Sequence, residues 1–148
     1  MIILDTNVIS EVMRPKPSPN VIAWLNKQSK YSLYLTTVTI AEIGAGVCKL
    51  DHGKRRDDLE RRYKDFVELF TGRILDVDLM AAMRFGSIIG DARERGITIS
   101  FQDGLIASIA QTQQSAAVAT RDVIPFGNAN IEVINPWEAD PETGIIVR

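Results

Sequence analysis

The sequence predicts an α/β fold in which helices cover both faces of a central, mainly parallel sheet. Short apolar segments alternate with segments whose apolar residues recur at helical spacing, as in consecutive β–α units. Segments 1–4 and 116–119 are continuously apolar, as expected for strands buried on both faces of a parallel sheet. A length of 148 residues suits one domain with its own core.

The first half of the chain is predicted to contain two strands and two helices. The strand at 1–4 ends in the polar residues Asp5-Thr6-Asn7 and is followed by a loop. Ser18 and Pro19 are typical of a helix start, and the apolar spacing extends that helix to about residue 28. A β-branched and aromatic strand at 32–37 precedes a helix with its apolar face at 40–50, which places Glu42 in the first turn.

The second half continues the alternation. The predicted elements are, in order, a helix at 59–70 ended by Gly72, a strand at 73–77, a long helix capped by Asp78 and ended by Gly96, a helix capped by Ser100, and strands at 116–119 and 131–134. Residues 1–137 are expected to form the domain. The tail 138–148 is expected to lie outside the core and to be mobile or docked on a partner.

Composition excludes several functional classes. The single cysteine, Cys48, cannot form an internal disulfide and is predicted to be a buried, inert thiol, and the single histidine, His52, lies in a polar turn. A two-histidine acid–base mechanism is therefore excluded. No apolar segment is long enough to span a bilayer, and the first residues lack the features of a signal peptide, so a cytoplasmic location is expected.

Four carboxylates occupy positions where apolar segments turn polar: Asp5, Glu42, Asp103 and Asp122. Asp5 and Asp122 follow predicted parallel strands, whose carboxyl ends are where reactive groups gather in such sheets. Acids brought together repel one another unless a cation balances them, and Mg²⁺ or Mn²⁺ prefers oxygen ligands. The predicted chemistry is metal-assisted hydrolysis of a phosphodiester.

Each acid also has a purely structural interpretation. Asp103 follows Ser100 by three residues and could complete a capping box, and Glu42 could stabilise its helix through the dipole. Asp122 could pair with Arg121 in a loop. Asp5 is the hardest to explain in this way, because a carboxylate directly after a buried strand pays for its desolvation unless it meets a cation or donors.

Four segments together resemble the PIN-domain nucleases, in particular the VapC-type toxins of bacterial toxin–antitoxin pairs and their FitB-like branch. They are Ile3-Leu-Asp-Thr-Asn-Val-Ile-Ser10, Thr37-Val-Thr-Ile-Ala-Glu-Ile43, Asp103-Gly-Leu-Ile-Ala107 and Ala119-Thr-Arg-Asp122, and Asn135-Pro-Trp137 adds to the likeness. Phe101-Gln102 departs from the small residues usual before the third acid, which affects the expected pocket mouth.

The resemblance implies a single PIN-like domain with endoribonuclease activity that depends on Mg²⁺ or Mn²⁺. It implies that Asp5, Glu42, Asp103 and Asp122 bind the metal, with Thr6, Asn7 and Thr120 as supporting polar groups. It also implies a homodimer and neutralisation by a small antitoxin protein that often binds DNA.

Basic residues near the acids are candidates for contacts with RNA phosphates. Arg14 and Lys16 lie in the predicted loop after the first strand, and Arg121 adjoins Asp122; ordinary surface charges are the alternative interpretation. The charged segment 54–65 is interpreted as a solvated helix. The net charge of −2 opposes generic nucleic-acid binding, although metal bound by the acids would cancel part of it locally.

Two other functions stay open at this point. A catalytically silent scaffold of the same fold could bind RNA or an antitoxin without cutting. An aspartate-nucleophile phosphatase could use Asp5, but Asn7 stands where such an enzyme would carry a second aspartate.

Overall fold

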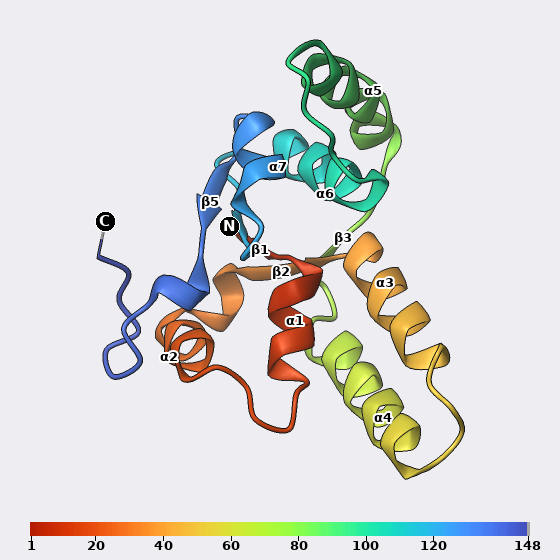
Figure 1. Ribbon diagram of the computed structural model, residues 1–148, viewed down its shortest axis with the longest axis vertical. Helices are drawn as coiled ribbons and strands as arrows, with labels where there is room; N and C mark the ends of the chain where they lie inside the picture. The colour runs from red at the N-terminus through yellow and green to blue at the C-terminus, as the bar shows by residue number, and fades with distance from the viewer. Residues whose placement is uncertain (148) are drawn as a thin grey trace.

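The computed structural model describes residues 1–147, which form a five-stranded sheet flanked by helices (Figure 1). The strand order is β3-β2-β1-β4-β5, and every pairing is parallel. The strands are β1 (Ile2–Leu4), β2 (Leu33–Thr36), β3 (Ile74–Leu75), β4 (Ala117–Ala119) and β5 (Glu132–Ile134). The predicted α/β fold with a parallel sheet is therefore confirmed.

Helices lie on both sides of the sheet. They are α1 (Thr6–Val12), α2 (Pro19–Lys27), α3 (Thr37–Cys48), α4 (Lys54–Leu69), α5 (Leu79–Glu94), α6 (Phe101–Thr112) and α7 (Val123–Asn128), with 3-10 turns η1 (Lys30–Ser32) and η2 (Pro136–Glu138). In Figure 1, α1 to α4 lie below the sheet and α5 to α7 above it. This is the two-sided cover that a parallel sheet requires.

The central strand β1 joins two separate hydrophobic cores. Leu4 packs in the core formed with α1 and α2, whereas its neighbour Ile3 packs in the core formed with α6 and α7. Successive side chains of a strand point to opposite faces, so β1 is buried on both sides. Asp5, the residue that follows β1, therefore leaves the sheet at a point where helices cover both faces.

Two short helices were not predicted. Helix α1 occupies much of the segment expected to be a loop after the first strand, and α7 follows β4. They span only 7 and 6 residues, which is too short for apolar periodicity to stand out. Their buried residues, Val8 and Ile9 in α1 and Phe126 in α7, show that tertiary packing holds them.

Two of the predicted helix caps, Asp78 and Ser100, are confirmed by side-chain hydrogen bonds, whereas Ser18 precedes α2 without such a bond. The Asp78 carboxylate accepts a hydrogen bond from Ala81 N at 2.8 Å, and Ser100 Oγ accepts one from Asp103 N at 3.0 Å. Gly96 follows α5 with a φ of 71°, a left-handed conformation that suits glycine. The predicted burial of Cys48 is wrong, because this last residue of α3 is exposed.

The segment after residue 137 is attached to the domain. Ala139 is 1% exposed and belongs to the core, and Asn20 Nδ2 of α2 donates to the carbonyls of Trp137 at 3.2 Å and Ala139 at 2.7 Å. The expectation that residues from 138 lie outside the core is wrong at Ala139. Within residues 1–147, no helix has the length and apolarity needed to cross a membrane.

Gly144 provides a test of how firmly this segment is docked. Its φ is 67°, and an added Cβ would overlap the carbonyl group of Ala23, which is backbone and cannot turn aside. We expect Gly144→Ala to lower the free energy of unfolding by about 1–3 kcal/mol and to speed amide exchange in residues 139–147.

The matched control is Gly90→Ala on α5, where an added Cβ meets no atom within 4 Å. Because alanine is the better helix former, this variant should be more stable by about 0.5–1 kcal/mol. Equal stability of the two variants in chemical denaturation would show that the terminal segment is not docked as described.

Candidate active site

Asp5 emerges where β1 meets the start of α1 at the carboxyl edge of the sheet. The residue is 4% exposed, and its backbone N donates to the carbonyl of Ala119 in the neighbouring strand β4 at 3.0 Å. Asp5 Oδ1 accepts a hydrogen bond from Thr6 N at 2.7 Å, so the carboxylate also caps α1. The predicted position of Asp5 at a strand end is confirmed by this geometry.

Thr120 connects the groups around Asp5. Its fully buried hydroxyl donates to Asp5 Oδ2 at 2.7 Å and accepts from Asn7 Nδ2 at 2.9 Å and from Asp122 N at 3.0 Å. A hydroxyl has one proton and two acceptor lone pairs, so its hydrogen-bonding capacity is fully used. Thr120 therefore fixes the orientation of the Asp5 carboxylate and the path of the chain after β4.

Glu42 reaches the same site from α3. Thr6 Oγ1 donates to Glu42 Oε2 at 2.5 Å, which links the acid to the residue after Asp5. The helix begins at Thr37, capped by Thr36 through the backbone N of Thr39, so Glu42 lies in the second turn. Its predicted position in the first turn is wrong, and the interpretation that it only serves the helix dipole loses its basis.

Asp103 combines a capping contact with proximity to Asp5. Ser100 Oγ donates to Asp103 Oδ2 at 2.7 Å, so the predicted association of these residues at the start of α6 is present. The half-buried Asp103 also acts electrostatically on Asp5. The capping interpretation and a role at the site are thus compatible.

Asp122 is the most loosely placed of the four acids. It is exposed at the start of α7 and caps that helix with no side-chain hydrogen bond. Among residues 1–147, no ion pair joins it to Arg121, whose guanidinium lies 5.1 Å from the ring centre of Trp137 instead. Its connection to the site is the hydrogen bond from its backbone N to Thr120.

The environment of Asp5 raises its pKa from the ordinary 3.8 to about 6. Burial is the largest cause; hydrogen bonds from Thr120 and Thr6 act in the opposite direction, and the charges of Asp103 and Glu42 raise the pKa further. Two of the predicted acids, Asp103 and Glu42, therefore act electrostatically on a third, Asp5. Asp122 is not among the groups that shift Asp5.

The oxygen donors and the unfavourable negative charge are features that a divalent cation would match. However, no three acids, histidines or cysteines in the described part of the chain stand close enough together to form a ready metal cluster. The residue types at this edge of the sheet therefore fit Mg²⁺ or Mn²⁺.

A cavity of about 690 Å³ opens beside Thr6 and Glu42, between α1, α3 and α4. Its inner wall is apolar, and its rim carries the basic residues Arg14, Lys54, Arg55 and Arg62. Arg14 was predicted near the site, whereas the three from α4 were assigned to a solvated helix. No local pattern in the sequence indicates this position, because only the packing of α4 beside α3 brings the three residues to the cavity.

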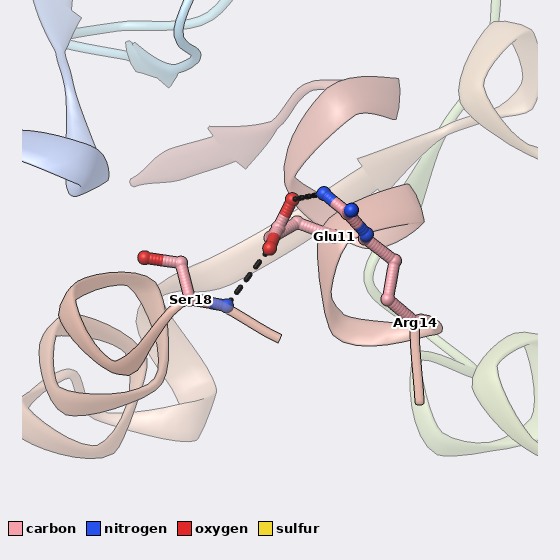
Figure 2. A network of polar contacts seen from close by, with 3 residues as sticks. All are labelled: Glu11, Arg14 and Ser18. Atoms are coloured by element: carbon pink, nitrogen blue, oxygen red, sulfur yellow. Dashed lines mark hydrogen bonds and ion pairs between the residues drawn. The ribbon is translucent and has the colours of Figure 1, made fainter. Parts of the chain in front are cut away.

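The other two residues predicted to contact RNA, Lys16 and Arg121, do not line this cavity. Lys16 is exposed and is not among the residues that line this cavity. Arg121 is exposed as well, and its backbone N donates to Asn7 Oδ1 at 3.4 Å. Arg14 lies at the cavity rim with a side chain that is 63% exposed, and it forms an ion pair with Glu11, a buried acid that sequence reasoning missed (Figure 2).

Residues 2–129 match the PIN domain family, and the chain belongs to this family. It is 44% identical over 138 residues to the toxin FitB of Neisseria gonorrhoeae, which covers 93% of this chain and 99% of that protein. It is 39% identical over 139 residues to the VapC ribonuclease Y4jK of Sinorhizobium fredii, at 93% and 99% coverage.

A solved structure supports the same assignment. A chain of the FitAB complex bound to an IR36 DNA fragment superposes with a TM-score of 0.88 and 41% identity, covering 95% of this chain and 98% of that one. The predicted resemblance to the PIN-domain family, and to its VapC and FitB branch, is thus confirmed by sequence and by fold.

The raised pKa of Asp5 predicts how stability depends on pH in metal-free protein. Because the folded-state pKa of about 6 exceeds the ordinary 3.8, folding favours the protonated acid, and stability falls as pH rises between these values. The full difference corresponds to about 3 kcal/mol. We expect Asp5→Asn to gain stability relative to wild type by up to this amount between pH 4 and pH 7.

Denaturation in EDTA across this pH range measures the effect. Asp65→Asn, on an exposed position of α4, is the control and should track wild type throughout. If Asp5→Asn runs parallel to wild type at all pH values, the pKa of Asp5 is not raised in the folded protein.

Proposed function

We propose that this PIN-domain protein is a metal-dependent endoribonuclease, the toxin component of a toxin–antitoxin pair. The observation that supports the proposal most directly is the buried Asp5, which Thr120 and Thr6 hold at the carboxyl edge of the sheet beside Glu42 and Asp103. Fixing a carboxylate in an environment that raises its pKa costs stability, as is typical of functional sites.

In this proposal, Asp5, Glu42, Asp103 and Asp122 hold Mg²⁺ or Mn²⁺, which supplies charge stabilisation for the phosphodiester and lowers the pKa of a bound water. The chain's own contribution is orientation. Thr120 fixes one oxygen of Asp5 and Thr6 N fixes the other, while the Thr6 hydroxyl directs Glu42 toward the same site. Asn7 supports Thr120 from the opposite side.

The proposed partners are RNA as substrate, a small cognate antitoxin protein that binds DNA, and a second copy of the chain. The antitoxin is supported by similarity to FitB, whose complex FitAB was solved bound to DNA. The homodimer follows from the family resemblance. Exposed apolar side chains near the starts of α5 and α6, namely Leu79, Met80, Met83 and Phe101, offer surface for such a contact.

A catalytically silent scaffold is the second candidate. It is favoured by one observation, the absence of a ready three-acid metal cluster among residues 1–147. The phosphatase alternative gains no support, because Asn7 donates its amide to Thr120 and cannot serve as a second acid.

Cleavage of an RNA panel by purified protein distinguishes the two candidates. We expect cutting with Mg²⁺ or Mn²⁺, none with EDTA, and a loss of about 100-fold or more in Asp5→Asn, the size of effect expected for a group at the reacting centre. The amide of asparagine can still accept from Thr6 N, so the fold should survive.

Asp65→Asn again serves as the control, and Asp122→Asn tests whether the fourth acid is required. Calorimetric titration with Mn²⁺ gives a second readout, in which binding to wild type should be lost in Asp5→Asn. RNA binding without cutting, and without Mn²⁺ binding, would favour the scaffold. Equal cutting by wild type and Asp5→Asn would point to a contaminating nuclease.

A further inference from the structure

The loop between α1 and α2 is fastened by the carboxylate of Glu11. Glu11 Oε1 accepts from Ser18 N at 2.8 Å, and Oε2 accepts from Arg14 Nη1 at 3.1 Å. Figure 2 shows the carboxylate between the two donors, with the Arg14 guanidinium turned back toward it. One acid thus holds both ends of the segment from residue 14 to residue 18.

Glu11 is a charged group in a buried position, since the residue is only 7% exposed. Burial alone would raise its pKa, but hydrogen bonds from Ser18 and Arg14 and the charges of Arg14 and Arg121 together lower it below its ordinary value. A buried carboxylate is costly unless it is paired and hydrogen-bonded. A surface loop can be held in place without a buried charged side chain, so the burial of Glu11 calls for a further explanation.

What distinguishes this loop is the place of Arg14. Arg14 lines the same cavity as Thr6 and Glu42, and its side chain is 63% exposed. In the described part of the chain, its only side-chain hydrogen bond goes from Nη1 to Glu11. A guanidinium has five N–H donors in a fixed plane, so most of them stay available to a ligand.

We propose that Glu11 is a positioning residue that holds Arg14 at the cavity rim, where its guanidinium binds a phosphate of the RNA strand adjacent to the phosphodiester that is cut. The inference rests on the proposed ribonuclease function. It adds a specific anion-binding group and the acid that orients it.

The physical advantage is preorganisation. A free arginine loses rotamer freedom when it binds a phosphate, and this loss weakens binding. A contact with a buried carboxylate fixes the side chain before the ligand arrives. The pairing with Glu11 uses Nη1 of the guanidinium and leaves the other donors in the same plane, which suits the two oxygens of a phosphate.

Binding and cleavage are measured separately. Binding is followed by fluorescence anisotropy of a labelled single-stranded RNA of mixed sequence in EDTA, over a range of salt concentrations. Cleavage of the same RNA with Mn²⁺ gives kcat and KM. The variants are Glu11→Gln, Arg14→Ala, the double variant and Arg14→Lys. The control is Arg61→Ala, because Arg61 also pairs with an acid three residues away but lies outside the cavity lining.

We expect Arg14→Ala to weaken RNA binding about fivefold and to reduce the salt slope of log K by about 0.7, the value for one phosphate contact on a single strand. Glu11→Gln should weaken binding about threefold and raise KM in proportion with kcat unchanged, since glutamine keeps the acceptor for Ser18 N but loses the charge. Adding Glu11→Gln to Arg14→Ala should have no further effect.

Arg14→Lys tests the geometry without touching Glu11. It should keep the salt slope and lose affinity, because lysine retains the charge but not the planar donors. The inference is overturned if Glu11→Gln binds RNA as tightly as wild type, if the effects of Glu11→Gln and Arg14→Ala multiply, or if Arg14→Lys matches wild type.

Different results would contradict the ribonuclease function and the positioning role of Glu11. If wild type cuts RNA and Glu11→Gln matches it in both KM and affinity, the ribonuclease function stands and the role of Glu11 falls. If wild type neither binds nor cuts RNA, the ribonuclease function falls and the inference falls with it.

Discussion

The arrangement of the site depends on one hydrogen bond, from the Thr120 hydroxyl to the Asp5 carboxylate. It joins the residue that follows β1 to the residue that follows β4, at the edge where these parallel neighbours end. The same hydroxyl accepts from Asn7 and from the backbone of Asp122. A single buried oxygen thus sets the relative position of two segments, residues 5–7 and 120–122, that are distant in the sequence.

This interaction holds the Asp5 carboxylate in a place that is unfavourable for charge. Burial and the neighbouring Asp103 and Glu42 raise the pKa of Asp5 to about 6, even though two hydrogen bonds favour its ionised form. The fold supplies the packing that keeps the carboxylate there, because β1 is buried on both faces of the sheet. The packing energy of the sheet therefore offsets the unfavourable electrostatic energy of the buried Asp5 carboxylate.

The sequence was sufficient to predict the parallel sheet, most of the helices and the position of Asp5. Each of these has a local signal: continuous apolar strands, caps such as Asp78 and Ser100, and an acid directly after a strand. Helices α1 and α7 had no such signal, because packing rather than periodicity holds them. The role of Glu11 could not be found either, since Ser18 becomes its neighbour only when the loop folds back, and a pair of charges three residues apart such as Glu11 and Arg14 is common on exposed helices.

Helix α1 has a consequence for which sequences this fold can accept. At 7 residues, it is far shorter than an isolated helix that is stable in water, so it relies on packing and on its cap, Asp5. Asparagine or serine at position 5 would preserve a cap while removing the charge, whereas alanine or valine would remove both. Related proteins that have lost the carboxylate but kept the fold are therefore expected to carry another capping residue at position 5. The helix that starts after this position thus limits which substitutions the site can accept.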